Sequence, residues 1–347
     1  MRNPHKLLFE FFVYCTVQIF DLSHREVGQL SRVASCQRSY VLNGIGQARV
    51  LTSSTDPLWA AGVLDVGKLV VLTSDAGVEP WGGWIIRCEQ ALGSLTITCK
   101  SLAYIFTKRR LGKSEFFPYA TPNQLQKQLT ALTGPFIVSD AGNIDTTAPF
   151  SKEFHFTGGA AALRRLPYDT GVDWWVTIGA NGVGVLHTGN HGTDKSQFVL
   201  LAEGSNIQSD PAPTYTRDGE QLINDSVYVG RGDGAWESAP RAQKKDHASI
   251  TEWGLYQGTG VQYDVVHSST LEEVARREVE RKSQPRELLE FYLANINGVW
   301  STFLTGDVVQ VRIPSLGQNG INGPMRVVGL EMDELADSPC RVMGEMV

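Results

Sequence analysis

Two short apolar runs decide the fold prediction for this sequence: WIIRC at residues 84–88 and LTITC at residues 95–99. They stand on either side of a turn that contains Gly93. β-Branched and aromatic residues on both sides of a short glycine turn are typical of an antiparallel hairpin. The pair therefore predicts two neighbouring strands, at 82–90 and 94–99.

The same pattern of short apolar runs separated by turn residues extends over most of the 347 residues. Thirty-five glycines and 15 prolines separate short runs of Val, Ile, Leu, Thr, Tyr and Trp, which indicates a β-dominated protein. Further strands are predicted at 47–53 and 67–73. Strands this short and evenly spaced favour a small barrel, and we expect a strand-rich N-terminal barrel domain over residues 1–105.

Residues 7–20 form an apolar stretch after Lys6 that superficially resembles a signal-peptide core. Glu10 interrupts the stretch and no small-residue cleavage site follows, so we do not expect a targeting segment. From Val13 the side chains alternate between two faces, which predicts a first strand that ends near Asp21. Nothing elsewhere reaches the ~18 to 20 apolar residues of a membrane-spanning helix, and we expect no such segment.

The middle of the chain, residues 106–200, is predicted to be an α+β domain. Thr121 can cap a helix with Pro122 at its first position, and leucines then recur on one face until Gly134. A second short helix is expected at 159–166, closed by Pro167. A strand at 173–178 and a glycine-rich turn follow it.

Residues 201–347 are predicted to form a second β-barrel domain with a packed helix at 270–282, where an apolar stripe opposes a charged face. The predicted strands in and just before this part lie at 198–202, 221–229, 249–255, 261–266, 288–294, 307–313 and 325–333. The fold class that follows is mainly β with α+β insertions.

The charge of the chain argues against sequence-independent binding of nucleic acid. The formal net charge is −6, and the densest basic clusters are Lys108-Arg109-Arg110 and Lys244-Lys245. Binding a phosphate backbone tightly needs several basic side chains on one face. A mildly acidic surface instead repels DNA.

The five cysteines, Cys15, Cys36, Cys88, Cys99 and Cys340, are scattered and odd in number. They show no C-x-x-C pattern and no Cys/His ligand spacing, so we expect neither a zinc site nor a disulfide framework. Buried thiols of this kind pack as small hydrophobic groups. This usage fits assembly in a reducing cytoplasm.

Few residues carry a chemical motif. His187 and His191 have the spacing of helix-borne metal ligands, but Gly189 and Gly192 predict a loop, so we interpret them as exposed turn histidines. The stretch 179–184 is rich in glycine, yet a strand follows it where a phosphate site needs a helix N-terminus. Arg231-Gly232-Asp233 is interpreted as an exposed turn.

Catalysis is not indicated. Carboxylates are frequent at 218–233 and 331–337, but their spacing in sequence does not give the separation that sugar hydrolysis needs. The motifs G-x-S-x-G and H-E-x-x-H are absent from the sequence. We therefore predict no catalytic, cofactor-binding or metal-binding residues and no cofactor, and a cell-wall hydrolase remains only a third hypothesis.

Eight tryptophans raise the alternative of a carbohydrate- or receptor-binding module, because exposed indole rings stack on sugars. Seven of them lie in or beside predicted strands, where aromatic residues more often belong to a core or an interface. These are Trp59, Trp81, Trp84, Trp174, Trp175, Trp253 and Trp300.

The order of several segments resembles phage tail hub proteins, the ring-forming family of tail tips and baseplates that includes the hub part of type VI secretion spikes. The likeness covers most of the chain from about residue 45 onward. The segments that carry it are 64–72, 81–86, 95–102, 170–175, 202–207, 224–230, 249–256, 306–311 and 325–331.

The resemblance implies two related small β-barrels with α+β insertions, and three subunits that close into a ring beneath the tail tube. It implies a structural, non-enzymatic subunit of the virion tail tip, assembled in the host cytoplasm. The implied partners are two further copies of the chain, a distal tail protein, the tape measure protein and tip or fibre proteins. The tape measure and then DNA would pass through the lumen without specific binding.

Overall fold

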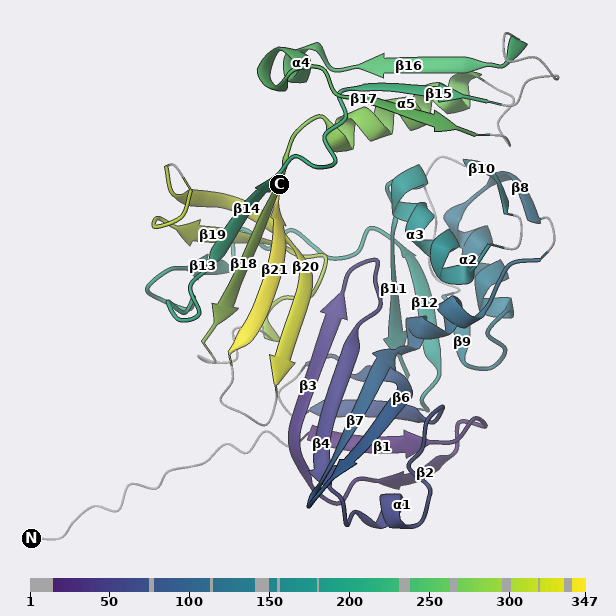
Figure 1. Ribbon diagram of the computed structural model, residues 1–347, viewed down its shortest axis with the longest axis vertical. Helices are drawn as coiled ribbons and strands as arrows, with labels where there is room; N and C mark the ends of the chain where they lie inside the picture. The colour runs from purple at the N-terminus through teal and green to yellow at the C-terminus, as the bar shows by residue number, and fades with distance from the viewer. Residues whose placement is uncertain are drawn as a thin grey trace, which may run out of the picture.

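The computed structural model describes residues 15–347 except 75–77, 113–114, 141–149, 155–156, 180, 231–237, 263–267, 295–300, 318 and 334–338. One large sheet runs through the molecule, and two smaller helix-covered sheets branch from it (Figure 1). Its strands are β1 Cys15–Phe20, β2 Glu26–Gln29, β3 Val33–Val41, β4 Gln47–Ser53, β5 Leu69–Ser74, β6 Trp81–Ala91, β7 Ser94–Ser101, β13 Leu200–Ala202, β14 Thr214–Asp218, β18 Arg286–Leu293, β19 Val308–Ile313, β20 Ile321–Asp333 and β21 Cys340–Met346.

The N-terminal half of this sheet has the strand order β3-β4-β7-β6-β5-β1-β2. The predicted hairpin is confirmed as β6 and β7, which pair antiparallel with Cys88 opposite Ile97. Side chains on β4 and β7 alternate between buried and more exposed, because successive residues of a strand point to opposite faces. The first predicted strand is confirmed as β1. A short helix, α1 Pro57–Ala60, follows β4.

The C-terminal half is built from β14, β18, β21, β20 and β19 in that spatial order, with β13 parallel to β19. A bridge between Ile207 and Leu293 connects the chain after β13 back to β18, so the half curls around its own core. Phe291, Phe303 and Val311 are fully buried there. Apolar burial of this kind is the main term that holds each half together.

The two halves are joined edge to edge by β3 and β20, whose residues Gln37–Val41 and Gly329–Asp333 pair antiparallel. Strand β3 was missing from the sequence prediction, because Gln37, Arg38 and Ser39 break its apolar pattern. Arg38 is nevertheless buried, and its Nη1 donates to the carbonyls of Leu72 and Glu79 at 3.3 and 3.4 Å.

The first layer, as we call it, comprises β9 Ile137–Ser139, β11 Asp173–Ile178 and β12 Gly184–Gly189, covered by α2 Pro122–Ala131 and α3 Gly159–Thr170. The 3₁₀ helix η1 Leu102–Lys108 leads into it from β7, and β8 Glu115–Ala120 pairs with β10 Phe150–Phe154 beside it. The expected helix start is confirmed: Thr121 and Gln124 form a reciprocal capping box ahead of α2.

Helix α3 runs past Pro167, which we had predicted to end it. The Thr170 hydroxyl donates to the Leu166 carbonyl at 2.7 Å and sustains the last turn. Gly171 then ends the helix with a φ of 73°, the left-handed conformation that glycine adopts without strain.

The second layer comprises β15 Asp225–Val229 between β16 Arg241–Lys245 and β17 Gln257–Val261, with helices α4 His247–Trp253 and α5 Ser268–Lys282. The prediction of a strand at 249–255 is wrong. The Asp246 carboxylate accepts hydrogen bonds from the backbone N–H groups of Ala248 and Ser249 at 3.0 and 3.1 Å, which caps α4. Strand β17 ends at Val261, and part of the predicted strand 261–266 lies outside the described residues.

Helix α5 contains the predicted helix 270–282, but it packs on β15 and β16 and not on the C-terminal half of the large sheet. In Figure 1 it lies under its own sheet at the end of the molecule farthest from β1 and β2. Leu271 and Ala275 from the expected apolar stripe are fully buried against this sheet.

The mainly β fold class with α+β insertions is confirmed. The boundaries at residues 105 and 200 stay predictions, and the pairing of β3 with β20 makes the two expected barrels continuous halves of one sheet. In the described parts of the chain, no helix is both long and apolar enough to cross a membrane.

Candidate functional site

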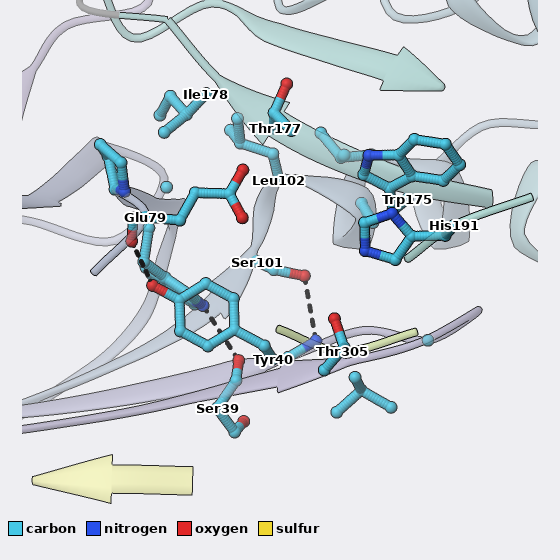
Figure 2. Close-up of a pocket in the computed structure, with 18 residues that line it drawn as sticks. Ser39, Tyr40, Glu79, Ser101, Leu102, Trp175, Thr177, Ile178, His191 and Thr305 are labelled. Atoms are coloured by element: carbon cyan, nitrogen blue, oxygen red, sulfur yellow. Dashed lines mark hydrogen bonds between the residues drawn. The ribbon is translucent and has the colours of Figure 1, made fainter. Parts of the chain in front are cut away.

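A cavity of about 70 Å³ lies where the first layer meets the large sheet (Figure 2). Its walls come from β3, β6, η1 and β11, together with His191 and Thr305 from two loops. These segments are far apart in sequence, so the cavity forms only when the first layer and both halves of the large sheet have come together.

Glu79 points its carboxylate into this cavity (Figure 2). The residue is fixed through its backbone, because its carbonyl accepts hydrogen bonds from the Tyr40 hydroxyl and from Arg38. Burial raises the pKa of the Glu79 carboxyl, and the nearby His187 and Arg38 side chains only partly oppose this effect.

Trp175, which lines this cavity, stacks against two histidines. Its ring centroid lies 5.0 Å from that of His187 and 4.2 Å from that of His191. The imidazole of His187 lies 2.7 Å from the Asp140 carboxylate through Nδ1 and 2.8 Å from the Thr177 hydroxyl through Nε2. Burial lowers the pKa of His191, although Asp173 and Asp307 act in the opposite direction.

Asp173, at the first position of β11, joins three parts of the fold. Its carboxylate accepts a hydrogen bond from Asn43 Nδ2 at 2.7 Å and forms an ion pair with Arg326 on β20. Asn43 also accepts from the backbone N–H of Trp174 at 2.7 Å. The Asp173 side chain is only 7% exposed, so its negative charge depends on these partners.

A second buried carboxylate lies next to this ion pair. Asp307 accepts hydrogen bonds from the backbone N–H groups of Thr193 and Leu304 at 2.7 and 2.8 Å, and Lys195 approaches it to 2.8 Å. Burial opposes ionisation of Asp307, but Lys195 and the two N–H groups hold its pKa below the usual value. The chain after β12 is thus tied to the turn before β19.

Two glycines allow the backbones to cross here. A Cβ atom on Gly192 would lie 2.1 Å from the carbonyl carbon of Gly306, and both residues have positive φ angles, 86° and 93°. Any larger residue would separate the two segments. Gly192 therefore serves the contact between the first layer and the C-terminal half of the large sheet, a role that its position after His191 in the sequence did not reveal.

The prediction that His187 is an exposed turn residue is wrong, because it lies within β12 opposite Trp175. His191 follows β12 in a loop and is partly buried against the same ring. Among the described residues, no group of three or more His, Cys, Asp or Glu is arranged to hold a metal ion.

Strands β11 and β12, on either side of the stretch 179–184, pair as the predicted antiparallel hairpin. Gly179 donates its N–H to the Val183 carbonyl at 2.9 Å, and β12 follows directly. Arg231-Gly232-Asp233 lies outside the described residues. Lys108 ends η1, and the Lys244-Lys245 pair lies on β16.

The carboxylate-rich segments are held by charge pairs and hydrogen bonds. Asp225 accepts hydrogen bonds from Gln243 and Gln257 at 2.6 and 2.9 Å, and Lys245 lies 3.4 Å away. Glu331 pairs with Arg341 at 3.1 Å. These contacts give both carboxylates a structural role within their sheets.

The tryptophans divide into core and edge positions. Trp81, Trp84 and Trp174 are buried, which removes them from any sugar-binding surface. Trp59 and Trp253 are partly exposed, and their indole N–H groups donate to Gln90 and Gln284. Trp300 lies outside the described residues.

The junction residues Asn43, Asp173, Asp307 and Arg326 were not singled out by the sequence patterns. Asn43-Gly44 was recognisable as a turn, but single charged residues in strands carry no local signal. Their side chains bind one another and the backbone, and so join the first layer to both halves of the large sheet. The arrangement is suited to fixing these three parts in one orientation.

Comparison with known proteins identifies the fold. No protein-family model matches the sequence, and no curated protein does. Among solved structures, prophage tail protein gp18 from Listeria monocytogenes EGD-e aligns over 95% of this chain and 94% of its own, with 13% identity and a TM-score of 0.62. The 43 kDa tail protein of prophage MuSo2 from Shewanella oneidensis aligns over 96% and 98%, with 14% identity and a TM-score of 0.61.

A third structure extends the comparison to secretion systems. The E. coli c3393 protein is a component of the type VI secretion system with structural similarity to the T4 bacteriophage tail proteins gp27 and gp5. It aligns over 95% of this chain and 76% of its own, with 11% identity and a TM-score of 0.51. At these identities the likeness establishes a shared fold.

Proposed function

We propose, from the fold that this chain shares with phage tail proteins and a component of the type VI secretion system, that it is a structural subunit of a phage-type tail tip or baseplate hub. Three copies form a ring that joins the tail tube to tip or fibre proteins. A distal tail protein and the tape measure protein are its other partners. The carrying observation is the alignment with two prophage tail proteins over nearly the full length of both chains.

The polar junction supports a structural role over a catalytic one. Asp173 and Asp307 are each buried and each bound by several donors from the protein itself. A catalytic carboxylate has to be accessible to a substrate, whereas these two hold the first layer against the large sheet. We therefore propose that the chain is not an enzyme.

The charge of the chain is compatible with a channel. A net charge of −6 provides no general attraction for DNA, so DNA passing through the lumen would not be retained. The continuous sheet through β3 and β20 gives each subunit a stiff frame around such a lumen. We place the protein in the virion, at the tail tip, after assembly in the host cytoplasm.

Ring closure needs two different surfaces on each subunit, and the two halves of the large sheet offer them. Leu22 and Val66 are exposed at a groove of about 410 Å³ in the N-terminal half. Phe198 and Leu200 are exposed beside β13 in the C-terminal half, Phe198 to 86%. Exposed large apolar side chains are enriched at protein interfaces.

The test is the mass of the purified protein in solution, combined with negative-stain images of the same sample. Rings of three subunits are expected. Val66→Asp and Phe198→Asp should each break the ring, whereas Leu92→Asp, at the fully exposed tip of the β6–β7 hairpin, should leave it intact. A stable monomer that also fails to bind a purified tail-tube or tip protein would overturn the proposal.

A further inference from the structure

The N-terminal half of the large sheet has a seam between its first and third strands. Strand β1 pairs with β2 and β5, and β3 pairs with β4 and β20. The path β3-β4-β7-β6-β5-β1 therefore brings β1 back to β3, and the two strands lie against each other without belonging to one ladder. The β1–β2 ladder ends beside this seam, where the backbone N–H of Leu30, directly after β2, donates to the Val17 carbonyl at 3.0 Å.

Two cysteines face each other across the seam. Cys15 begins β1 and Cys36 lies in the middle of β3, and their sulfur atoms are 2.7 Å apart. Cys15 is 8% exposed and Cys36 is fully buried. Two unbonded sulfur atoms normally stay well over ~3 Å apart, whereas a disulfide bond is about 2.05 Å long, so less than about 1 Å of movement separates this contact from a bond.

The other two cysteines of this half, Cys88 and Cys99, have thiols whose reactivity is lowered by burial. Burial raises the pKa of the Cys99 thiol and raises that of Cys88 to about 11. Both thiols therefore remain protonated near neutral pH and react slowly, since the thiolate is the reactive form. Cys99 packs in the same core as Cys15 and Cys36 and is the competing partner that a test must distinguish.

We propose that Cys15 and Cys36 form a disulfide bond that closes the seam when the folded chain meets an oxidising low-molecular-weight disulfide. The inference rests on this geometry alone and is independent of the proposed tail function. It modifies the expectation that all five thiols stay reduced, which holds in a reducing cytoplasm and not after exposure to an oxidising medium.

The chemistry is two successive thiol–disulfide exchanges. The Cys15 thiol, the more exposed of the two, loses its proton and attacks one sulfur of the oxidant, which releases one small thiol. Cys36 then loses its proton and attacks the Cys15 sulfur of this mixed disulfide, which releases the second small thiol. Two S–H bonds and one S–S bond of the oxidant are replaced by one protein S–S bond and two S–H bonds.

The bond would fix the register of β1 against β3 and close a loop of about 20 residues in the unfolded chain. A cross-link of this span restricts the unfolded ensemble and raises the thermal midpoint, by roughly 5 °C for a chain of this size. The bond would leave the rest of the fold unchanged, because the two cysteines already lie in the same core and on adjacent strands.

The experiment treats the purified full-length protein with oxidised glutathione or with dithiothreitol, followed by unfolding and alkylation. All five cysteines should be alkylated after reduction, and three, five minus the bonded pair, after oxidation. Tryptic digestion should then join peptide 7–25, which contains Cys15, to peptide 33–38, which contains Cys36. The thermal midpoint of the oxidised sample should be higher.

Cys36→Ser should abolish both the linked peptide and the rise in midpoint, and Cys340→Ser, which removes a buried cysteine from the other half, should keep both. If Cys36→Ser does not fold, the presence or absence of the linked peptides 7–25 and 33–38 in the wild-type protein and in Cys340→Ser decides whether the bond forms. Alkylation of all five cysteines in protein that was oxidised while folded and then unfolded would overturn the proposal, as would a bond between Cys36 and Cys99.

Discussion

The first and second layers have the same plan, yet they are attached to the large sheet in different ways. Each is a three-stranded sheet with one antiparallel and one parallel strand pair, covered by helix. The first layer shares one core with the large sheet, in which Leu129 and Leu186 pack together with Trp84. The second layer has a core of its own, centred on Leu271 and Tyr228.

This difference concerns which parts of the molecule unfold together. The helices of the first layer cannot leave without exposing apolar side chains of the large sheet, so the two should unfold in one transition. Among the described residues, the buried core of the second layer contains only residues of that layer, so we expect it to open separately. The second layer is therefore the part of the chain best suited to change position while the frame stays intact.

The largest effect is expected for Leu129→Ala, which creates a cavity in the shared core. Leu129 is fully buried on α2, and removing such a side chain costs about 2–5 kcal/mol. The free energy of unfolding should fall by this amount in guanidinium denaturation, with the large sheet and the first layer lost together. Leu92→Ala, at an exposed hairpin tip, is the control and should change it by less than about 0.5 kcal/mol. A separate early transition for the first layer would contradict the shared core.

Leu271→Ala should act within the second layer. Leu271 is fully buried on α5, and its loss should weaken the layer by about 2–4 kcal/mol. Hydrogen exchange should accelerate by well over tenfold in β15, β16 and β17, while protection of β18 and β21 stays as in the wild type. Equal loss of protection in β21 would show that the second layer is not independent.

The sequence predicted elements whose signals are local. Strand β4 at 47–53 and strand β11 at 173–178 were placed to the residue, and Thr121 with Pro122 marked the start of α2. Residues 249–255 were predicted to form a strand, but residues 249–253 belong to helix α4, which the Asp246 side chain caps.

The junction and the joining of the two halves could not be predicted in the same way. Asp173 and Arg326 meet across 153 positions of sequence, and β3 pairs with β20 nearly 300 positions away. Such contacts depend on how the sheets curl and leave no periodic pattern in either segment. The interpretation of His187 as a turn residue failed for a related reason, since β12 continues through Gly189 to pair with β11.

A third prediction concerns the polar attachment of the first layer to the C-terminal half. Arg326→Met leaves the Asp173 carboxylate buried without its cation, and we expect a loss of about 2–4 kcal/mol. Adding Asp173→Asn to Arg326→Met should recover part of the lost free energy of unfolding. A double-mutant cycle should give an interaction energy of about 1–3 kcal/mol between the two side chains.

Arg341→Met is the matched control for this cycle. The two arginine side chains are equally exposed, at 34% and 35%, but the carboxylates that Arg341 contacts are 38% and 47% exposed, against 7% for Asp173. Ion pairs in contact with water contribute about 1 kcal/mol or less, so Arg341→Met should cost far less than Arg326→Met. Equal costs would mean that burial of the carboxylate does not set the strength of this attachment.

The smallest effects are expected from pH, and they should have opposite signs at Glu79, between strands β5 and β6 of the large sheet, and at Asp225, in the second layer. Burial raises the pKa of Glu79, which faces the cavity under the first layer. Its contribution to stability is therefore complete below about pH 4.5, the usual value for a glutamate, and is lost as the pH rises through the raised value. Glu79→Gln should consequently stabilise the protein at pH 7, and the difference from the wild type should vanish in acid.

Asp225 in the second layer reverses this sign. Burial opposes its ionisation, but Gln257, Gln243 and Lys245 together hold its pKa below the usual 3.8. Its contribution is present above that value and is lost as the pH falls through the lowered pKa, so Asp225→Asn should destabilise the second layer at pH 7 and converge with the wild type in acid. Urea denaturation of both variants between pH 3 and 7, with hydrogen exchange reporting the second layer, measures the two slopes. Slopes of the same sign would show that the donors around Asp225 do not outweigh its burial.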